Sequence, residues 1–530
     1  MYLISLLYKE KKKKFDFKIK ESSKSDLDNI RMDKVSSDLS QNRQYVNFRF
    51  SLPDNGDIIV RDVSFYLGKE LKKAFLVCVD GLTNGEMINE AILKPLMVYS
   101  DKDEKSTADI EYISNHLIPH AQISKSDDME SLMSTVNIGN AIMFIDGFDK
   151  ALIFDVKSWE HRGVSSPSAE EVIQGPHEGF NEVLRCNTAL IRKTLNNPDL
   201  VMENITFGKT SKTPGSVAYI KNVANDSLVE EVKRRINSLD AEYILSSLDV
   251  EQYIEEASFL PIPQIVTTER PDRVCKALVE GRVAIVLNGS SHVLVMPATI
   301  FDLASSVEDE YLRFPYSLLI RLVRMAAVMI SLLTPAVYVA ITLYHQDMIL
   351  KDLFLSIQSS RLSVPFPIIF ELLIMELSFE LIREAGVRVP GHIGSTLGIV
   401  GGLILGTAAV DANIGSPIMI IVVAITGIAS FAIPSYSLSF SLRFSRFIYI
   451  LAASLGGFLG LFSAFFSITV MYMGTKSFGV PYGSPVAPYK KQKGISAFFR
   501  KPLWMQEERP EYLRPKSKKS KPPVTRKWLY

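Results

Sequence analysis

Few residues of this chain have the types and spacing that catalysis or metal binding needs. Residues 208–210, Gly-Lys-Thr, resemble the end of a phosphate-binding loop. The first glycine of such a loop would fall on Glu203, however, so the backbone cradle for phosphate is missing. His116 and His120 are four residues apart, yet no carboxylate or third ligand accompanies them. We therefore expect no catalytic residue, no cofactor and no metal, and we expect that the chain is not an enzyme.

The cysteines give no stronger chemical signal. Cys78, Cys186 and Cys275 are far apart in a chain of 530 residues and form no Cys-x-x-Cys pair. Each lies in an apolar or helical context, so we expect small buried hydrophobic side chains rather than disulfides, metal ligands or nucleophiles.

Acidic residues inside an apolar segment are a more unusual signal. The segment 366–382 carries Glu371, Glu376 and Glu380, and Glu384 follows just beyond it. At 100° per residue the last three fall within an arc of about 80° and form one acidic stripe on a helix. A carboxylate at the centre of a bilayer costs roughly 2.5–3.5 kcal/mol, so this stripe cannot face lipid as bare charge.

Three interpretations of the acidic stripe are open. The helix lies at the membrane interface, or it spans the membrane with its acidic face toward water or a partner, or it spans the membrane with protonated carboxyl groups. Arg383 and Arg388 at the end of the segment could pair with the stripe.

The elements that must position this stripe emerge when the chain is divided near residue 315. The net charge of +1 and the 47% of hydrophobic residues average two unlike halves, and they argue against a nucleic-acid-binding protein. Upstream, charged residues recur every few positions. Downstream, charge-free apolar runs predict membrane spans at 325–343, 393–410, 418–434 and 447–473. We predict a transmembrane domain at 313–474 with four to six spans.

Charge distribution predicts the orientation. The tail at 475–530 is rich in Lys, Arg and Pro, so we expect a disordered cytoplasmic segment that could touch anionic lipid. The N-terminal half, with a basic flexible segment at 1–44, is also expected in the cytoplasm, which requires an even number of crossings. We favour four full spans plus the irregular acidic segment; otherwise the last run is split, at Gly456-Gly457.

Small residues at a spacing of four predict helix-packing faces. They occur in the second and the last run, as Gly394, Gly398, Gly402 and Gly406, and as Ala452, Gly456, Gly460 and Ala464. Such stripes let helix backbones approach closely in lipid, either within one subunit or between subunits of a ring. Residues expected at span ends or in loops are Asp411, Pro365, Pro367, Pro417 and Pro434. The alternative to a loop position for Asp411 is a role in an ion site.

The upstream half is predicted to contain a duplicated α/β unit. Asp146-Gly147 and Asn288-Gly289 predict two hairpins whose strands align at an offset of 142 residues. A strand and helix at 75–93 match 216–234 at an offset of 141. We predict α/β subdomains at 45–160 and 200–312, joined by a helical connector at 161–199. The predicted fold class is thus an α/β soluble N-terminal region followed by an α-helical multi-pass transmembrane domain.

Several long strings resemble one family. They are VPFPIIFELLIMELSFELIREAGVRVP at 364–390, SPIM at 416–419, WEHR at 159–162, VIQGPHEGF at 172–180, TERPD at 268–272 and GVPYGSPVAP at 479–488. From about residue 45 to 490 the chain resembles the A subunits of bacterial spore germinant receptors, the GerA family. It departs from the pattern at Gln346 and Ser291, where proline is usual, which puts only local backbone stiffness in doubt.

The resemblance implies a protein of the spore inner membrane that acts with a transporter-like B subunit and a lipoprotein C subunit. It also implies a homo-oligomeric ring, a pentamer, whose membrane part forms a nutrient-gated ion channel that releases monovalent cations and starts germination. The alternative is a non-conducting signalling scaffold within the same receptor complex.

Overall fold

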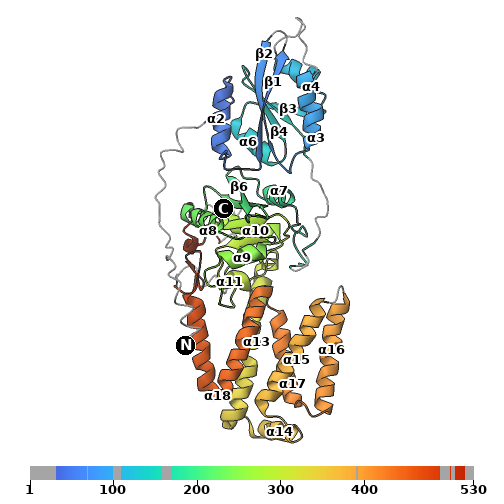
Figure 1. Cartoon of the computed structure of the whole chain (residues 1–530), viewed down its shortest axis with the longest axis vertical. Helices are drawn as coiled ribbons and strands as arrows, with labels where there is room; N and C mark the ends of the chain where they lie inside the picture. Colours follow the sequence, from blue (N-terminus) through green and yellow to red (C-terminus); the bar gives the residue numbers. More distant parts are fainter. Residues whose placement is uncertain are drawn as a thin grey trace.

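The computed structural model is elongated, with two α/β units stacked at one end and a bundle of helices at the other (Figure 1). It describes residues 32–67, 70–98, 109–157, 172–388, 392–489 and 508–519, and the isolated positions 166, 167, 170, 502 and 506.

The first α/β unit is built on a five-stranded antiparallel sheet in the order β1-β2-β4-β5-β3. Its strands are β1 (Ile58–Leu67), β2 (Glu70–Val79), β3 (Ile123–Ser126), β4 (Ala141–Ile145) and β5 (Ala151–Phe154). The helices are α2 (Leu39–Arg49), α3 (Gly85–Met87), η2 (Ile88–Leu93), α4 (Lys94–Val98), α5 (Ile110–Tyr112), η3 (Ile113–Leu117) and α6 (Met129–Asn137). Strand β4 is buried along its whole length because helices cover both faces of the sheet, with α2 and α6 on one face and η2, α4 and α5 on the other.

The second unit repeats this plan in the strand order β6-β7-β9-β10-β8. Its strands are β6 (Leu200–Phe207), β7 (Thr213–Ile220), β8 (Val266–Thr268), β9 (Val283–Leu287) and β10 (Val293–Met296). Its helices are α7 (Leu184–Thr194), α8 (Asp226–Asn237), α9 (Ser247–Ile254) and α10 (Pro271–Glu280). Helices α7 and α10 cover one face, and α8 and α9 cover the other. From Ala141 at the start of β4 to Val283 at the start of β9 is 142 residues.

A pair of buried asparagines repeats as well. The side chain of Asn42 in α2 accepts from the backbone N–H of Ser36 at 2.9 Å and donates to its carbonyl at 2.6 Å. Asn187 in α7 makes the same two bonds to Asn181, at 2.9 and 2.6 Å. In both units the asparagine therefore fixes the chain that enters the first helix.

The unit boundaries differ from those expected. The first turn of α2 lies inside the segment 1–44 that was expected to be flexible, and α7 lies inside the expected connector 161–199 but packs on β7, β9 and α10. Both hairpins form, through five-residue connections in which Gly147 and Gly289 have positive φ. Neither connection is the two-residue type I′ turn that Asp-Gly and Asn-Gly favour, because the residue before each glycine does not adopt positive φ.

A buried ion pair joins the two units. Arg192 of α7 is fully buried and donates from Nε and Nη2 to Asp57 at 2.8 and 2.9 Å. Its Nη1 also donates to Asn137, at 3.1 Å, so one guanidinium ties α7 to two elements of the first unit. Such a bidentate pair fixes the relative orientation of its partners.

The helical domain follows at the far end of the molecule (Figure 1). Short helices α11 (Ile300–Ala304) and α12 (Glu308–Tyr311) lead into it. Its elements are α13 (Phe314–Tyr344), η4 (Gln346–Met348), α14 (Lys351–Arg361), α15 (Ile368–Arg388), α16 (His392–Asp411), α17 (Pro417–Phe431) and α18 (Tyr436–Gly474). Of the described helices, α13 and α18 are long and apolar enough to cross a membrane.

Helix α18 reverses direction at Gly456 and Gly457, whose backbone dihedrals are not helical. As a straight helix it would place Ser445 and Tyr472 about 40 Å apart at 1.5 Å per residue. Their hydroxyl groups instead lie 2.8 Å apart. The preferred prediction of one continuous span at 447–473 is therefore wrong, and the alternative, a split at Gly456-Gly457, is what the structure contains.

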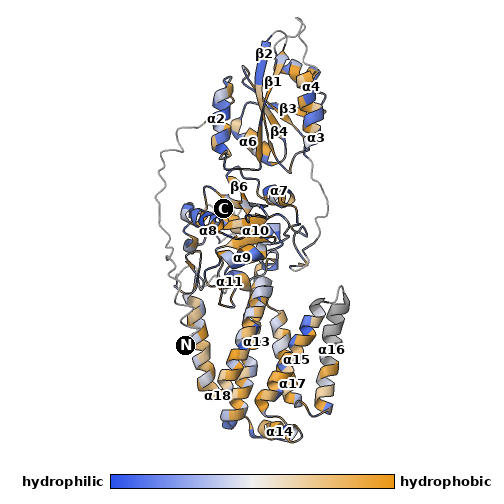
Figure 2. Ribbon diagram, in the orientation of Figure 1, coloured by the Kyte–Doolittle hydropathy of each residue, from blue (hydrophilic) through white to orange (hydrophobic). Residues whose placement is uncertain are grey.

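Apolar side chains cover the outside of the helical domain. Figure 2 shows apolar residues along α13, α17 and α18, whereas α2 and α3 carry many polar residues. Leu455 is 84% exposed, Leu459 80% and Ile428 70%. Surfaces of this kind face lipid or other protein chains.

Parts of the tail 475–530, which was expected to be disordered, fold onto the second α/β unit. Strands β11 (Lys476–Ser477) and β12 (Val480–Pro481) form a small hairpin, and η6 (Glu511–Leu513) lies further along. The cause is apolar burial, because Phe478, Tyr482 and Leu513 are almost completely buried.

Candidate functional site

The acidic residues of α15 form ion pairs with arginines of other helices, and we call this set the ion-pair ladder. It consists of three pairs, Glu371 with Arg361, Glu376 with Arg446, and Glu380 with Arg443. From the first to the third glutamate the ladder extends about 14 Å along the helix.

Glu371 lies at the end of the ladder farthest from the α/β units. It is fully buried, and its Oε1 accepts from the backbone N–H and the hydroxyl of Ser416, at 2.6 and 2.7 Å. Ser416 is the residue before α17, so the carboxylate also meets the positive end of that helix. The Nε of Arg361 in α14 lies 3.4 Å from Oε2. Glu371 therefore links α14, α15 and α17.

Glu376 forms the central pair of the ladder. Both Glu376 and Arg446 are almost completely buried, and Nη1 of Arg446 donates to Oε2 of Glu376 at 2.6 Å. The Nη2 of the same arginine donates to Ser331 of α13 at 3.1 Å. This pair joins α13, α15 and α18 in the interior of the helical domain. It lies on the part of α18 before the reversal at Gly456 and Gly457, which we call the first leg; the part after the reversal is the second leg.

Glu380 forms the third pair, nearest the α/β units. Arg443 donates to its Oε2 at 2.6 Å, and Nη1 of Arg383 lies 3.8 Å from its Oε1. The guanidinium of Arg383 lies over the rings of Phe379 and Phe431, 5.2 and 4.6 Å from their centroids. Arg383 also donates from Nη2 to the hydroxyl of Ser430 and to the carbonyl of Gly427, so it contributes one long contact to the ladder and otherwise binds α17 and the two rings.

The ladder is only partly satisfied by hydrogen bonds. In the part of the chain that the structure describes, three buried atoms of the ladder have no hydrogen-bond partner, namely Oε1 of Glu376, Oε1 of Glu380 and Nε of Arg446, and the same holds for Nε of the adjacent Arg383. Each such atom costs about 1–3 kcal/mol, and more when charged. The ladder is therefore a costly arrangement, which stability alone does not explain.

The sequence predicted the acidic stripe but not its main partners. Arg361, Arg443 and Arg446 lie outside the charge-free runs and were not connected with the glutamates. Their signal is spacing, because Arg443 and Arg446 are three residues apart on one helix face and oppose Glu380 and Glu376. The side chain of Arg388, an expected partner, lies outside the described residues.

The glycines of α16 face two different surroundings. A side chain at Gly406 would meet Ile420 of α17 at 3.4 Å, while one at Gly402 would meet nothing within 4 Å. The surroundings of Gly394 and Gly398 lie outside the described residues. Of the two glycines whose surroundings are described, Gly406 therefore packs against α17 within the chain, whereas Gly402 has room for a side chain.

The glycines of α18 do not form one stripe, contrary to the prediction, because the helix reverses between them. Gly456 lies in the reversal and a side chain there would meet nothing within 4 Å, whereas one at Gly460 would lie 2.1 Å from the carbonyl oxygen of Ala452. Gly460 is thus required for close packing of the two legs of α18.

The predicted span-end residues lie at helix ends. Pro365 and Pro367 are between α14 and α15, Pro417 is the first residue of α17, and Pro434 is between α17 and α18. Asp411 is exposed at the last position of α16. Across the described parts of the chain, no three His, Cys, Asp or Glu side chains form a group that could hold a metal ion.

Two of the three cysteines are buried as expected, whereas Cys186 is partly exposed. Cys78 and Cys275 are buried, and burial raises the pKa of these thiols to about 11 and about 12. A thiol with so high a pKa is a poor nucleophile at neutral pH.

A second charged cluster connects the second α/β unit to the helical domain. Asp309 of α12 is buried and accepts from Arg324 at 2.7 and 3.1 Å and from Arg321 at 3.2 Å. The hydroxyl of Ser317 donates to the carbonyl of Asp309 at 2.8 Å. The first turns of α13 are therefore held to α12.

The chain is similar in sequence to known proteins over most of its length. The family model described as Bacillus/Clostridium GerA spore germination protein matches residues 46–512. Spore germination protein KA of Bacillus subtilis is 39% identical over 86% of this chain and 84% of its own length. Spore germination protein B1 of the same organism is 36% identical over 90% and 97%.

A solved structure also resembles part of the chain. It is the N-terminal domain of the A subunit of the Bacillus megaterium spore germinant receptor GerK3, with 26% identity, a TM-score of 0.40 and coverage of 51% of this chain and 99% of that domain. On the family match and the relatives at 39% and 36% identity, this chain belongs to the GerA family of spore germination proteins.

Proposed function

We propose that this chain is the A subunit of a nutrient germinant receptor and crosses the spore inner membrane several times. Family membership supports the receptor, since its relatives are named as spore germination proteins. The exposed apolar side chains of α17 and α18 support the membrane, and one relative, 36% identical, is named as the membrane protein YfkQ of Bacillus subtilis.

We propose six crossings, by α13, α15, α16, α17 and the two legs of α18. An even number keeps both α/β units and the basic tail on one side, which the positive-inside rule assigns to the cytoplasm. Helix α14 then lies at the opposite surface, where Figure 1 places it at the far end of the domain.

The proposed activity is nutrient-gated conduction of monovalent cations by a ring of these chains, a pentamer. The ring would act with a transporter-like B subunit and a lipoprotein C subunit. The open side of Gly402 and the exposed leucines of α18 offer surface for neighbouring chains.

The ion-pair ladder is the observation that carries this proposal. Carboxylates inside apolar helices are costly and typically mark ion pathways or switches. Oε1 of Glu376 and Oε1 of Glu380 accept no hydrogen bond from any described residue, so this arrangement leaves acceptors which water or a cation would satisfy. Opening would then separate α15 from the first leg of α18.

One observation favours the second candidate, a non-conducting scaffold. All three carboxylates of the ladder pair within the chain, so in this conformation they are neutralised. A ladder that only fixes the packing of α15 would serve a scaffold equally well.

Cation release from liposomes tests the two candidates. The complete receptor is reconstituted in liposomes loaded with K⁺, and nutrient is added. A channel releases K⁺, and Glu376→Gln changes the release while Asp411→Asn, an exposed acidic control, does not. Absence of release from a receptor that still binds nutrient would favour the scaffold.

A further inference from the structure

The end of the chain returns to the second α/β unit as an ordered segment, residues 508–519, which we call the C-terminal strap. Arg509 donates from Nε to the carbonyl of Val279 at 2.7 Å. Asn225 donates to the carbonyl of Arg514 at 3.0 Å, and the N–H of Lys516 donates to the carbonyl of Val223 at 3.0 Å.

The strap also buries apolar surface. Leu513 is completely buried and joins the hydrophobic cluster beneath α8 and α9, with Tyr512 packed against it. A buried leucine contributes about 1.5–3 kcal/mol relative to an exposed one. The strap is therefore held to the second α/β unit by apolar packing as well as by hydrogen bonds.

Tyr512 connects the strap to a buried ion pair. Arg282 donates from Nη2 to the hydroxyl of Tyr512 at 3.1 Å, and from Nη1 and Nη2 to Asp302 at 2.8 Å each. Burial raises the pKa of Tyr512, so this hydroxyl stays neutral. Although burial alone would raise the pKa of Asp302, Arg282 lowers it below its usual value and keeps the carboxylate charged.

Asp302 in turn holds the start of α11. Its Oδ2 accepts from the backbone N–H and the hydroxyl of Thr299, at 2.9 and 2.7 Å, and its own N–H donates to that hydroxyl. This is a capping box, which fixes where the helix begins.

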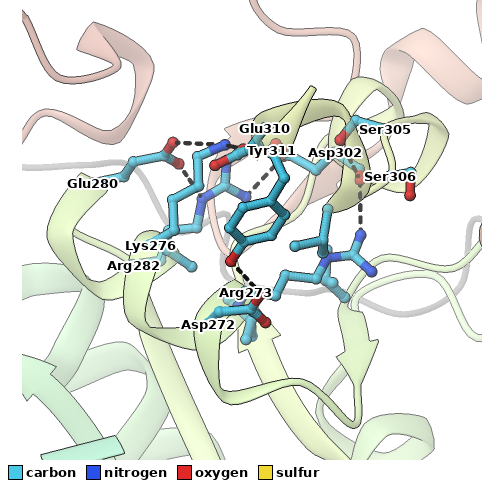
Figure 3. Close-up of a pocket in the computed structure, with 14 residues that line it drawn as sticks. Asp272, Arg273, Lys276, Glu280, Arg282, Asp302, Ser305, Ser306, Glu310 and Tyr311 are labelled. Atoms are coloured by element: carbon cyan, nitrogen blue, oxygen red, sulfur yellow. Dashed lines mark hydrogen bonds and ion pairs between the residues drawn. The ribbon is translucent and has the colours of Figure 1, made fainter. Parts of the chain in front are cut away.

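Helix α12 is held close to this ion pair, and we call the contacts around α11 and α12 the joint. Figure 3 shows Arg282 and Asp302 at a small pocket together with the contacts that hold α12. Tyr311 donates to Asp272 at 2.6 Å, and Lys276 pairs with Glu310. Asp309 of α12 then holds Arg321 and Arg324 of α13. Glu280 links the two sets of contacts, since it pairs with Arg282 at 3.3 Å and with Lys276 at 3.9 Å, so a continuous series of contacts runs from the strap to the first helix of the helical domain.

The exit of α18 is anchored close to the same place. Ser477 donates to the carbonyl of Gln264 at 2.6 Å and accepts from the N–H of Ala298 at 3.0 Å. The N–H of Ile300, the first residue of α11, donates to the carbonyl of Tyr482 at 3.1 Å. The second α/β unit thus holds both the entry and the exit of the helical domain.

We propose that the C-terminal strap is a clamp on this joint. By holding Arg282 on Asp302 through Tyr512, it fixes α11 and α12 and restrains α13. Release of the strap frees the joint and allows the helical domain to rearrange. The consequence for conduction rests on the proposed function, but the clamp itself does not.

Hydrogen exchange of the full chain in detergent tests the clamp directly. One variant ends at residue 507 and lacks the strap; its matched control ends at residue 519 and keeps it. We expect the amides of α11 and α12 to exchange about tenfold faster without the strap, because losing one buried hydrogen bond corresponds to about 1–3 kcal/mol. The control should exchange as the full chain does. Equal exchange in all three chains would overturn the clamp.

If the shorter chain does not accumulate, Tyr512→Phe combined with Arg509→Gln tests the same contacts, with the same expected and contradicting results. Carbodiimide treatment adds a second measurement. It joins Lys516 and Asp226, whose Nζ and Oδ1 lie 2.6 Å apart, by an amide, while the carbodiimide becomes a urea.

We expect this cross-link in the resting receptor, found by peptide mass analysis, and faster exchange in α11 and α12 wherever it is lost. Its absence from the resting full chain would contradict the docked strap. Faster exchange without any K⁺ conduction would contradict the channel and leave the clamp standing.

Discussion

The α/β units and the helical domain distribute charge and apolar surface in opposite ways. In the α/β units, apolar side chains fill both faces of each sheet, and most ion pairs lie toward the surface. In the helical domain, leucines and isoleucines lie outside while Glu371, Glu376 and Arg446 are buried. The inversion indicates two different solvents, water around one region and lipid or neighbouring chains around the other.

The comparison also separates two ways of burying a carboxylate. Glu376 in the helical domain is paired with Arg446. Glu251 in α9 accepts a hydrogen bond from Thr267, and among the described residues no arginine or lysine pairs with it. Burial disfavours the charged form of both carboxylates, but Glu376 has a cation that opposes this effect and Glu251 has none among the described residues. Four predictions test the comparison between the α/β units and the helical domain, in order of decreasing expected effect.

The largest effect is expected from removing one partner of the central pair. Arg446→Ala leaves the buried carboxylate of Glu376 without its cation, which costs about 3–5 kcal/mol. Thermal unfolding of the purified protein in detergent should show the loss. The double variant Glu376→Gln, Arg446→Gln removes both charges and should recover part of the stability. If the single and double variants are equally stable, then water reaches the pair. The helical domain would then not differ from the α/β units in burying its charges.

A pH-dependent effect is expected at Glu251. Burial raises the pKa of this carboxyl from 4.5 to about 7. The folded state therefore holds a proton that the unfolded state releases between these values, and this group's contribution to stability is lost as the pH rises from about 4.5 to 7. Glu251→Gln should be more stable than the wild type at pH 8, by up to about 3 kcal/mol. The advantage should vanish at pH 4.5; a constant difference at all pH values would contradict the raised pKa.

A steric effect is expected within α18. Gly460→Leu forces a side chain against the carbonyl of Ala452, and overpacking of this kind costs about 1–3 kcal/mol or prevents the two legs from closing. Gly402→Leu, the matched control on an open face, should leave the stability of the single chain unchanged. Size-exclusion chromatography of both variants then sharpens the comparison, since a loss of assembly in the Gly402 variant alone would place a neighbouring chain at α16.

The smallest effect is expected at the repeated asparagines. Asn42→Ala and Asn187→Ala each remove two hydrogen bonds to one backbone unit, at a cost of about 1–2 kcal/mol. Because the two positions are equivalent, the losses measured by urea unfolding should agree closely. A marked inequality would mean that the shared plan of the units does not extend to their energetics.

The sequence predicted much of the α/β region because its signals are local. Short continuous apolar runs and the glycines at 147 and 289 locate the central hairpins and their offset. Helix α2 was missed because its segment has no strong apolar periodicity. Helix α7 was predicted to be helical but was assigned to a connector, because its equivalence to α2 rests on Asn42 and Asn187, which are 145 residues apart.

The helical domain was less predictable because its determinants are not local. Hydropathy finds apolar runs, but the reversal at Gly456 and Gly457 depends on the legs of α18 packing together. The pairing of Glu376 with Arg446 joins residues 70 positions apart, and although the spacing on each helix can be seen in the sequence, nothing local shows that these two helix faces meet. The order of the C-terminal strap depends on the surface of the second α/β unit, which composition alone does not reveal.

Nutrient-triggered K⁺ release from liposomes that hold charge-exchanged receptors tests the central claim most directly, that pairing between α15 and α18 controls the helical domain. Glu376→Arg alone places two guanidinium groups together and should abolish regulated release. Adding Arg446→Glu restores an opposite pair and should restore nutrient-dependent release. If the double variant releases K⁺ no better than the single one, while both accumulate as the wild type does, the ladder does not control the helical domain.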